Sequence, residues 1–397
     1  MNITGNQKKP ALYRVAGLIA AAATIMLGAS CASKPHSPDT DTTAEKARAK
    51  VGLFLDEGCR GNGVLCWARL IERSPELELV LLTGQDIREG KLKGLNLLVC
   101  PGGGSARQIQ AMQKSGAAAV KQFIADGGSY LGACAGCYST TNREGRLRLL
   151  PYDYIDSAAG GYAALTIEVT GQGAKRLGIK PGRYTVRYHG GPVLRPTSAT
   201  GKGEGEVLAL YKSSAGKANR APYNFLNTPA AVCGTYGKGK VIATSFHPES
   251  WEATHGIALG CIYAVTGIQP VPVYPPKSLR PVRVGYCTRG AAVNPRAVRE
   301  MLALDRNPKL DVQFFSTQEV YEGILNHLDA VILSDGVRES YQKMMEDPVW
   351  RAGIRNFLDR GGLILASGNG ADFLRGHANL KILKVDEDMA PHLLKDR

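Results

Sequence analysis

The feature that most constrains the fold of this chain is a series of short apolar runs, each closed by glycine or a polar turn. Runs of this kind are typical of strands that are buried on both faces. They include KVGLFLDEG, LELVLLTGQDI and LNLLVCPGGG, and the segments SARQIQAMQKSG and AAAVKQFIADGG, which have helical spacing, lie between and after them. Strands that alternate with helices predict the α/β class, with flavodoxin-like parallel sheets covered by helices on both faces.

The series of strands and helices occurs twice. After a proline-rich stretch, RVGYCTRG echoes KVGLFLDEG, LDAVILSDG echoes LNLLVCPGG, and IRNFLDRGGLILASGNG echoes VKQFIADGGSYLGACAG. Aligning the paired glycines of the last two segments places Gly368 opposite Cys134 and Gly370 opposite Gly136. We therefore expect a second, truncated flavodoxin-like unit that keeps the turn and lacks the thiol.

The domain boundaries follow from length and from the proline-rich stretch. A chain of 397 residues is too long for one ordinary core, so two folded domains are the default expectation. The five prolines of IQPVPVYPPKSLRPV forbid a helix and discourage a central strand, which marks a linker. We expect a signal peptide at 1–30, a tether at 31–48, a first domain at 49–267, a linker at 268–281 and a second unit at 282–397.

The N-terminal segment has the pattern of a secretory signal. Basic residues precede an uncharged run from Val15 to Ser30, which is short for a membrane-spanning helix of about 20 residues. The run ends in LGASC, which resembles the bacterial lipoprotein cleavage box, although Leu27 sits one place further upstream than that box prefers. The resemblance implies a lipid anchor on Cys31 and a periplasm-facing place in the cell envelope. Ala32, in place of Asp, favours the outer membrane over the inner one. A plain secreted protein and an uncleaved anchor stay open.

Charge and cysteine content limit the classes of partner and cofactor. The formal charge of +14 is scattered along the chain, which indicates solubility and weak attraction to anionic surfaces, with no specific nucleic-acid partner. No Cys/His spacing resembles a zinc site, and we expect no metal and no organic cofactor. Eight cysteines besides Cys31 permit disulfides, with Cys59–Cys66 the closest loop candidate. The others outside the motif below, at positions 100, 233, 261 and 287, fit small buried hydrophobes.

The stretch GGSYLGACAGCYS contains the strongest candidate for chemistry. An apolar strand runs into Gly132-Ala133-Cys134-Ala135-Gly136, the pattern of a strained turn that exposes a nucleophile between small neighbours. A helix start and a nearby imidazole would both favour the Cys134 thiolate.

Two further segments complete a candidate site. The strand in GKGKVIATSFHPES ends at His247-Pro248-Glu249, which supplies a base together with a carboxylate that can orient it. The loop CPGGGS follows another strand and suits backbone N–H groups that point at a developing oxyanion.

These three motifs, in this order within an α/β pattern, resemble the class I glutamine amidotransferase family. Within that family the stretch GACAGCY looks most like the N-terminal domain of biotin–protein ligases. The resemblance covers residues 49–267 and implies that Cys134 is the nucleophile, His247 the base and Glu249 its orienting partner. It further implies that Gly103 or Gly104, with Ala135, donates the backbone N–H groups of the oxyanion site.

The resemblance supports thiol–acyl chemistry better than it supports glutamine as the substrate, because no synthetase domain accompanies the site to receive ammonia. We therefore expect a small-molecule or peptide amide as substrate and a thioester intermediate. Two alternatives stay open. One is a non-catalytic lipoprotein that binds a ligand in the pocket above the turn. The other is a redox protein that uses Cys134 and Cys137 as a C-x-x-C pair, or a disulfide between them that silences the nucleophile.

Minor candidates lie in the loops. His189, in RYHGGP, is a candidate rim contact, although an exposed turn residue is the simpler interpretation. Asp56 and Glu57 follow the first strand, where turn capping is the simpler interpretation. The oligomeric state and the identity of the substrate are not predicted.

Overall fold

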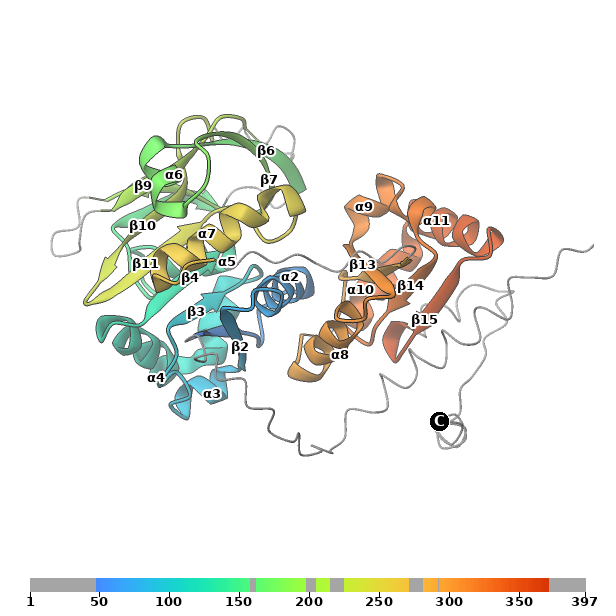
Figure 1. Ribbon diagram of the computed structural model, residues 1–397, viewed down its shortest axis with the longest axis horizontal. Coiled ribbons are helices and arrows are strands. Elements are labelled where there is room, and N and C mark those ends of the chain that lie inside the picture. Colours follow the sequence, from blue (N-terminus) through green and yellow to red (C-terminus); the bar gives the residue numbers. More distant parts are fainter. Residues whose placement is uncertain are drawn as a thin grey trace, which may run out of the picture.

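The computed structural model describes residues 48–157, 162–197, 205–214, 225–270, 281–291 and 293–370. Figure 1 shows them as two α/β units, the first coloured from blue to yellow and the second from orange to red. The expected signal peptide, Cys31 and all but the last residue of the tether lie outside the described residues, as does the centre of the linker.

The first unit combines one long sheet with helices and a short two-stranded ribbon. Its strands are β1 (Ala49–Phe54), β2 (Leu77–Leu82), β3 (Leu97–Cys100), β4 (Ser129–Ala133), β5 (Tyr152–Ser157), β6 (Tyr162–Val169), β7 (Gly182–His189), β8 (Pro192–Pro196), β9 (Glu206–Tyr211), β10 (Pro229–Tyr236) and β11 (Gly239–Thr244). Its helices are α2 (Gly61–Glu72), α3 (Gly84–Arg88), α4 (Ser105–Ala125), α5 (Ala135–Thr140), α6 (Gly171–Leu177), η1 (Glu252–Thr254) and α7 (His255–Thr266). The two helical segments predicted before β4 form α4, whose backbone leaves the helical region at Gln113 (φ 60°).

The long sheet is only partly the parallel sheet that the sequence predicts. Its order in the described part of the chain is β2-β1-β3-β4-β11-β10-β9-β6-β7. The first five strands are mutually parallel, whereas β10, β9, β6 and β7 join by antiparallel pairing. The two-residue turn Gly237–Lys238 between β10 and β11 explains the switch, because antiparallel strands need only a short hairpin and no crossover helix.

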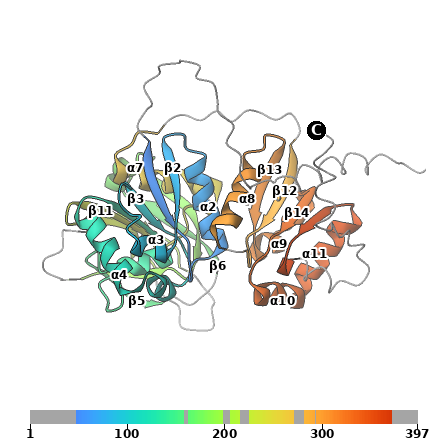
Figure 2. The same ribbon diagram turned by 90° about the horizontal axis from the view of Figure 1, so that it is seen from below.

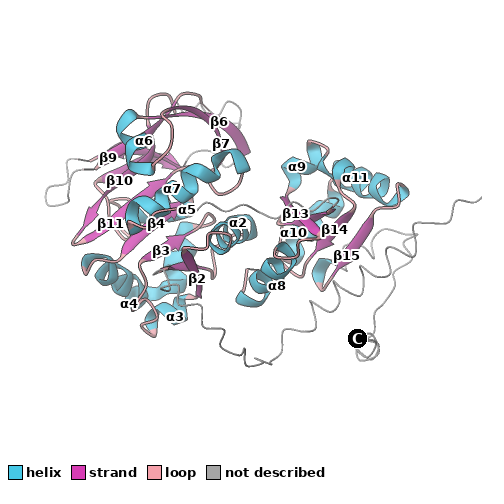
Figure 3. Ribbon diagram, in the orientation of Figure 1, coloured by secondary structure: helices cyan, strands magenta, loops and turns pink. Residues whose placement is uncertain are grey.

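The second unit is a smaller α/β layer structure. Its elements are β12 (Val282–Cys287), α8 (Pro295–Asp305), β13 (Leu310–Phe315), α9 (Thr317–Tyr321), η2 (Ile324–His327), β14 (Ala330–Leu333), α10 (Arg338–Glu346), α11 (Pro348–Asp359) and β15 (Leu363–Ala366). Among the described residues its strands pair in the parallel order β13-β12-β14-β15, which corresponds to β2-β1-β3-β4 of the first unit. Figure 3 shows the α/β character of both units, so the predicted fold class is confirmed. An origin of the two units by duplication stays a prediction.

Strand β14 shows why the second unit packs against the first. Alternate residues of a strand point to opposite faces. Val331 and Leu333 belong to a separate core with α9, α10 and α11, whereas Ala330 and Ile332 belong to the same continuous core as the first unit. The second unit therefore shares buried apolar surface with the first.

Helices α2 and α8 form the contact between the units, and Figure 2 shows them side by side. Arg69 of α2 and Arg73, directly after that helix, both donate to the Asp305 carboxylate, at 2.6 and 2.8 Å, and the Asp305 side chain is 4% exposed. A carboxylate buried to this degree needs its cations, because an unpaired buried charge is strongly destabilising. The contact thus fixes the second unit beside the N-terminal half of the first.

Candidate active site

Cys134 lies between the end of β4 and the start of α5, in a left-handed backbone conformation with φ 51° and ψ −99°. Such a conformation costs a residue with a side chain about 1–3 kcal/mol and clusters at functional sites. The flanking glycines are required by space. A Cβ on Gly132 would lie 2.4 Å from the Gly136 backbone, and one on Gly136 would lie 2.1 Å from the Cys100 carbonyl oxygen. The sequence motif is therefore a steric necessity of this turn.

The sheet brings His247 to Cys134. Strand β11 pairs in parallel with β4, with Thr244 opposite Ala133, so both strands end at the same edge of the sheet. The Cys134 N–H donates to the Thr244 carbonyl oxygen at 2.9 Å, which ties the turn to the strand that carries His247. Residues 113 positions apart in the sequence thus meet through one pair of neighbouring strands.

His247 interacts with both Cys134 and Glu249. Its Nδ1 lies 2.9 Å from Glu249 Oε1, and its imidazole is close enough to the Cys134 sulfur to interact with it electrostatically. Because Nδ1 is held by the carboxylate, Nε2 is the nitrogen left for the thiol. Glu249 is fully buried, so its carboxylate depends on this imidazole.

The charge state of His247 follows from its surroundings. Burial acts to lower the pKa of His247, but the sulfur of Cys134 and the carboxylate of Glu249 outweigh it and raise the pKa to about 9. An imidazole with this pKa holds a proton between the thiol and the carboxylate at neutral pH.

The glycine loop after β3 packs directly against the imidazole. A Cβ on Gly102 would lie 2.4 Å from His247 Cε1, so only glycine leaves room for the ring. Gly104 donates its N–H to the Gly58 carbonyl oxygen at 2.7 Å. This pairing removes Gly104 as an oxyanion donor and corrects the expectation for that residue. Gly103, with φ 146°, is left as the candidate in this loop.

The candidate donor on the other side is Ala135. It is the first residue of α5, and the first N–H groups of a helix have no partner within the helix. Ala135 and Gly103 are therefore the two candidate donors, one in the helix that follows Cys134 and one in the glycine loop.

Cys137 and His189 are neighbours of Cys134, and the structure places one in the core and the other at the cavity. The Cys137 thiol is fully buried in α5, and burial raises its pKa well above the ordinary value. All eight described cysteines are free thiols, so neither Cys134–Cys137 nor Cys59–Cys66 is paired in this structure. The backbone carbonyl of His189 accepts a 3.4 Å hydrogen bond from the Cys134 thiol, while its imidazole lines the cavity. His189 is exposed overall, but partial burial of its ring, and then the neighbouring cations, lower its pKa to about 4, which makes it neutral at physiological pH.

Cys134 opens into a cavity of about 940 Å³ that both units line. This volume is within the range of about 300–1,000 Å³ for small-molecule sites. The first unit supplies Cys134, His247 and Arg187, and the second supplies Thr288 and Arg289. The sequence analysis missed Arg187 and Arg289, because neither arginine lies in a motif. The sequence marks them only by position. Arg187 lies two residues before His189, and Arg289 follows the first strand of the second unit.

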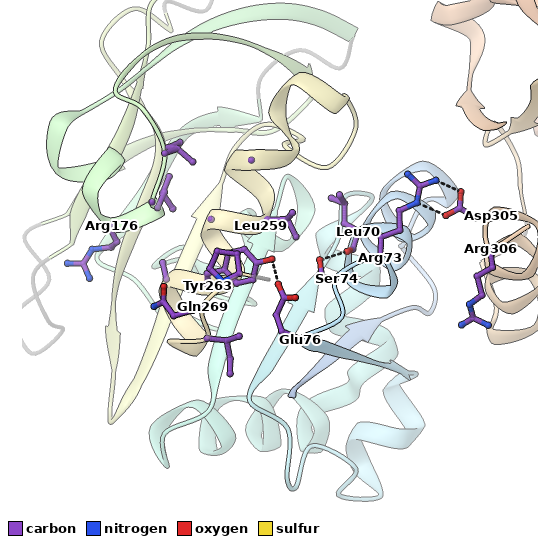
Figure 4. Close-up of a pocket in the computed structure, with 18 of the residues that line it drawn as sticks. Leu70, Arg73, Ser74, Glu76, Arg176, Leu259, Tyr263, Gln269, Asp305 and Arg306 are labelled. Atoms are coloured by element: carbon purple, nitrogen blue, oxygen red, sulfur yellow. Dashed lines mark hydrogen bonds and ion pairs between the residues drawn. The ribbon is translucent and has the colours of Figure 1, made fainter. Parts of the chain in front are cut away.

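A second hollow, of about 1,140 Å³, lies on the other side of the contact between the units and does not include Cys134 or His247. Figure 4 shows that Tyr263 points toward Glu76 in this hollow, and that Arg73 is paired with Asp305 at its rim. Because Glu76 is bound by Tyr263 and Asp305 by Arg73, we take the cavity that contains Cys134 as the candidate site.

Asp56 lies at the rim of the candidate cavity, and its carboxylate accepts the N–H groups of Glu57 and Gly84. The capping role preferred for Asp56 is therefore confirmed. In the part of the chain that the structure describes, no cluster of His, Cys, Asp or Glu has an arrangement that could hold a metal ion. No helix within the described ranges is long and apolar enough to cross a membrane.

Comparison with protein families identifies one match. Residues 88–144, which include the glycine loop and the Cys134 turn, match the model described as "Biotin-protein ligase, N terminal". The match agrees with the resemblance that the motifs indicate, and His247 and Glu249 lie outside it. No curated protein matches the chain.

Solved structures with similar folds include PurLQS from Thermotoga maritima, which is 16% identical over 54% of this chain and 99% of that chain, with a TM-score of 0.39. A glutamine amidotransferase is 21% identical over 55% of this chain and 99% of that chain, with a TM-score of 0.38. The beta-galactosidase from Bacillus circulans sp. alkalophilus is 14% identical over 56% of this chain, with a TM-score of 0.37. The aligned part spans 32% of that beta-galactosidase. At these identities the likeness concerns the α/β fold alone.

Proposed function

We propose that this chain is a cysteine hydrolase of the glutamine amidotransferase-like type, which cleaves an amide or related acyl bond through a thioester on Cys134. The observation that carries the proposal is the position of the His247 imidazole, which lines the same cavity as Cys134, interacts electrostatically with its sulfur, and hydrogen-bonds to Glu249. The strained turn at Cys134 and the cavity above it supply the remaining elements of a nucleophile site.

The proposed reaction begins with the proton on His247 and with Cys134 as the thiolate. The sulfur then forms a bond to the acyl carbon, and the carbonyl electrons move to oxygen as an oxyanion. Protonated His247 gives its proton to the leaving nitrogen, and the C–N bond breaks to leave a thioester. Water, deprotonated by His247, attacks the thioester carbon, and the C–S bond breaks to release the carboxylic acid and restore the Cys134 thiolate beside protonated His247. The sum is amide plus water giving acid plus amine.

The second unit supports the choice of Ala135 and Gly103 as oxyanion donors. Its turn at Gly368 corresponds to the turn at Cys134, because the strands before the two turns pair with their neighbours in the same register. In the first unit Cys100 pairs with Gly132, and in the second Leu333 pairs with Ala366. Each pair joins the ends of the two central strands. The loops and turns that follow these strands therefore occupy corresponding positions.

In the second unit the two corresponding N–H groups bind one oxygen. Asn369, at the position of Ala135, and Gly336, at the position of Gly103, both donate to Asp335 Oδ1, at 3.0 and 2.9 Å. An oxyanion formed on a Cys134 substrate needs this same convergence of two donors, each worth roughly 3–4 kcal/mol of barrier reduction. The comparison supports Ala135 and Gly103 as the pair.

Trapping the acyl-enzyme tests the proposal. The protein is incubated with p-nitrophenyl esters and p-nitroanilides of varied acyl groups, and tandem mass spectrometry locates the added acyl mass. We expect the mass on Cys134 and not on Cys137, slower acylation in Glu249→Gln, and no acylation in Cys134→Ala. Cys137→Ser is the matched control and should acylate normally. No acyl mass on Cys134 with any probe would contradict hydrolysis and favour a ligand-binding protein that does not turn over.

We also propose that the protein is exported and anchored through a lipid on Cys31. The support is the LGASC box after a basic and then apolar N-terminal segment, all of it outside the described residues. Labelling with a palmitate analogue in a bacterial host tests this. The label should appear on the wild type and be absent from Cys31→Ser, and equal labelling of both would contradict the anchor.

A further inference from the structure

The cavity above Cys134 contains a buried cation that has no carboxylate partner among the described residues. Arg187, on β7, is only 7% exposed, yet it lines the cavity. Its Nε is buried without a hydrogen bond, and within the described residues no carboxylate forms an ion pair with its guanidinium. Its guanidinium faces the ring of Tyr162, with a distance of 5.6 Å to the centroid. A buried, unpaired arginine is costly unless an anion completes it.

The second unit adds another arginine to the same cavity. Arg289 follows β12 and lines the cavity together with Cys134 and Arg187. Its Nη1 donates to Thr317 Oγ1 at 2.6 Å, which holds the side chain in place, and its Nε is buried without a partner. Both arginines line the cavity together with His189, and both act to lower the pKa of that imidazole.

The other charges of the cavity do not neutralise these arginines. The lining contains Arg60 and Lys343 as further cations, against the carboxylates of Asp56 and Glu57. Asp56 is occupied by two backbone N–H groups, and Glu57 is exposed. Glu319, on α9, is held by the Ser316 cap at the start of that helix. The cavity therefore presents an excess of positive charge around the nucleophile.

We propose that Arg187 and Arg289, one from each unit, bind a carboxylate of the substrate while its acyl carbon lies at Cys134. This inference rests on the proposed function and narrows it to amides or esters that carry a carboxylate. Two guanidinium groups with free N–H donors suit a carboxylate, because the planar fork donates paired hydrogen bonds to its oxygens. The second unit then has a defined role, since the site lacks half of its anion-binding pair without it.

Two alkylating probes of similar size test the proposal, iodoacetate as the anion and iodoacetamide as the neutral control. The second-order rate of each is measured at Cys134 by peptide mass spectrometry, in wild type and in Arg289→Gln. We expect Arg289→Gln to slow iodoacetate about fivefold while iodoacetamide changes less than about twofold. Raising the salt from about 0.02 M to about 0.2 M should slow iodoacetate in wild type for the same reason.

Arg283→Gln is the matched control, because it removes the same charge from the same strand region, where Arg283 pairs with Asp329 outside the cavity. It should leave both rates unchanged. Arg187→Gln should repeat the effect of Arg289→Gln, and Arg289→Lys should restore part of the iodoacetate rate. Equal slowing of both probes, or an iodoacetate rate that does not change in Arg289→Gln, would overturn the carboxylate site. If Cys134 reacts no faster than the other cysteines with either probe, the proposed function itself fails.

Discussion

The turn at Cys134 and the turn at Gly368 have nearly the same φ angle, but only the first carries a thiol. Their φ angles are 51° and 49°. A Cβ on Gly136 would meet the Cys100 carbonyl oxygen at 2.1 Å, and one on Gly370 would meet that of Leu333 at 2.3 Å. Both turns are therefore built on the same close contact between helix start and strand end.

The difference lies in what fills the space beside each turn. In the second unit the Asp335 carboxylate occupies it and takes the N–H groups of Gly336 and Asn369. In the first unit Gly102 stands at the position of Asp335, and the His247 imidazole packs against it. The comparison teaches that this turn is stable with or without a nucleophile. Chemistry needs the adjoining residue to be small, so that an imidazole and a substrate oxygen can enter.

Of the changes that test this difference between the two turns, removing the His247 imidazole should have the largest effect. In His247→Ala we expect alkylation of Cys134 by iodoacetamide near neutral pH to fall about 100-fold, because the thiol loses its base. Peptide mass spectrometry gives the rate, and Cys66, which is buried, serves as the internal reference. A fall of less than about threefold would show that His247 does not act on the sulfur.

Filling the space beside the imidazole should have the next largest effect. In Gly102→Ala the new Cβ meets His247 Cε1 at 2.4 Å, so the ring must move. We expect the Cys134 alkylation rate to fall at least tenfold, since displacements of about 1 Å cost up to 10² in rate. Gly104→Ala is the matched control, because a Cβ there meets nothing within 4 Å. Equal rates in the two variants would contradict the account of the glycine loop.

The proton on His247 predicts a pH dependence of stability in the first unit. Its pKa is raised from 6.5 to about 9, since Cys134 and Glu249 outweigh the opposing effect of burial. The folded state then holds a proton that the unfolded chain releases, so the free energy of unfolding falls as the pH rises from 6.5 to 9. We expect a loss of about 2–3 kcal/mol in urea denaturation. In His247→Gln this loss should disappear, and an unchanged slope would contradict the pairing.

The smallest effect should come from the second unit. Gly368→Ala places a Cβ 2.1 Å from Asp335 Oδ1, which must give up its two N–H donors. We expect a destabilisation of about 1–2 kcal/mol, measured by denaturation. In an Asp335→Gly background the same substitution should cost less. Additive costs in the double variant would mean that the carboxylate does not fill this turn.

Much of the geometry of the candidate site could be predicted from the sequence, because it depends on local rules. The apolar runs predict the parallel strands, and the glycines around Cys134 predict the strained turn. The His-x-Glu segment directly after β11 carries its own orienting carboxylate. These features are encoded within a few residues of each other.

The remaining features depend on pairing between distant segments. The antiparallel half of the sheet was not predicted, since its strands join across separate loops. The Gly104 N–H donates its hydrogen bond to the carbonyl of Gly58, which lies 46 positions earlier in the chain. Arg187 and Arg289 line one cavity because α2 and α8 hold the two units together, and no local pattern specifies that docking.

Competition among the eight described cysteines for a limiting alkylator measures the central claim most directly. The protein is treated near neutral pH with less than one equivalent of iodoacetamide, and each cysteine peptide is quantified. The account predicts that Cys134 takes up nearly all of the label, while Cys100 and Cys137, which burial keeps protonated, take up almost none. Labelling spread evenly over the cysteines, or unchanged at Cys134 in His247→Ala, would contradict it.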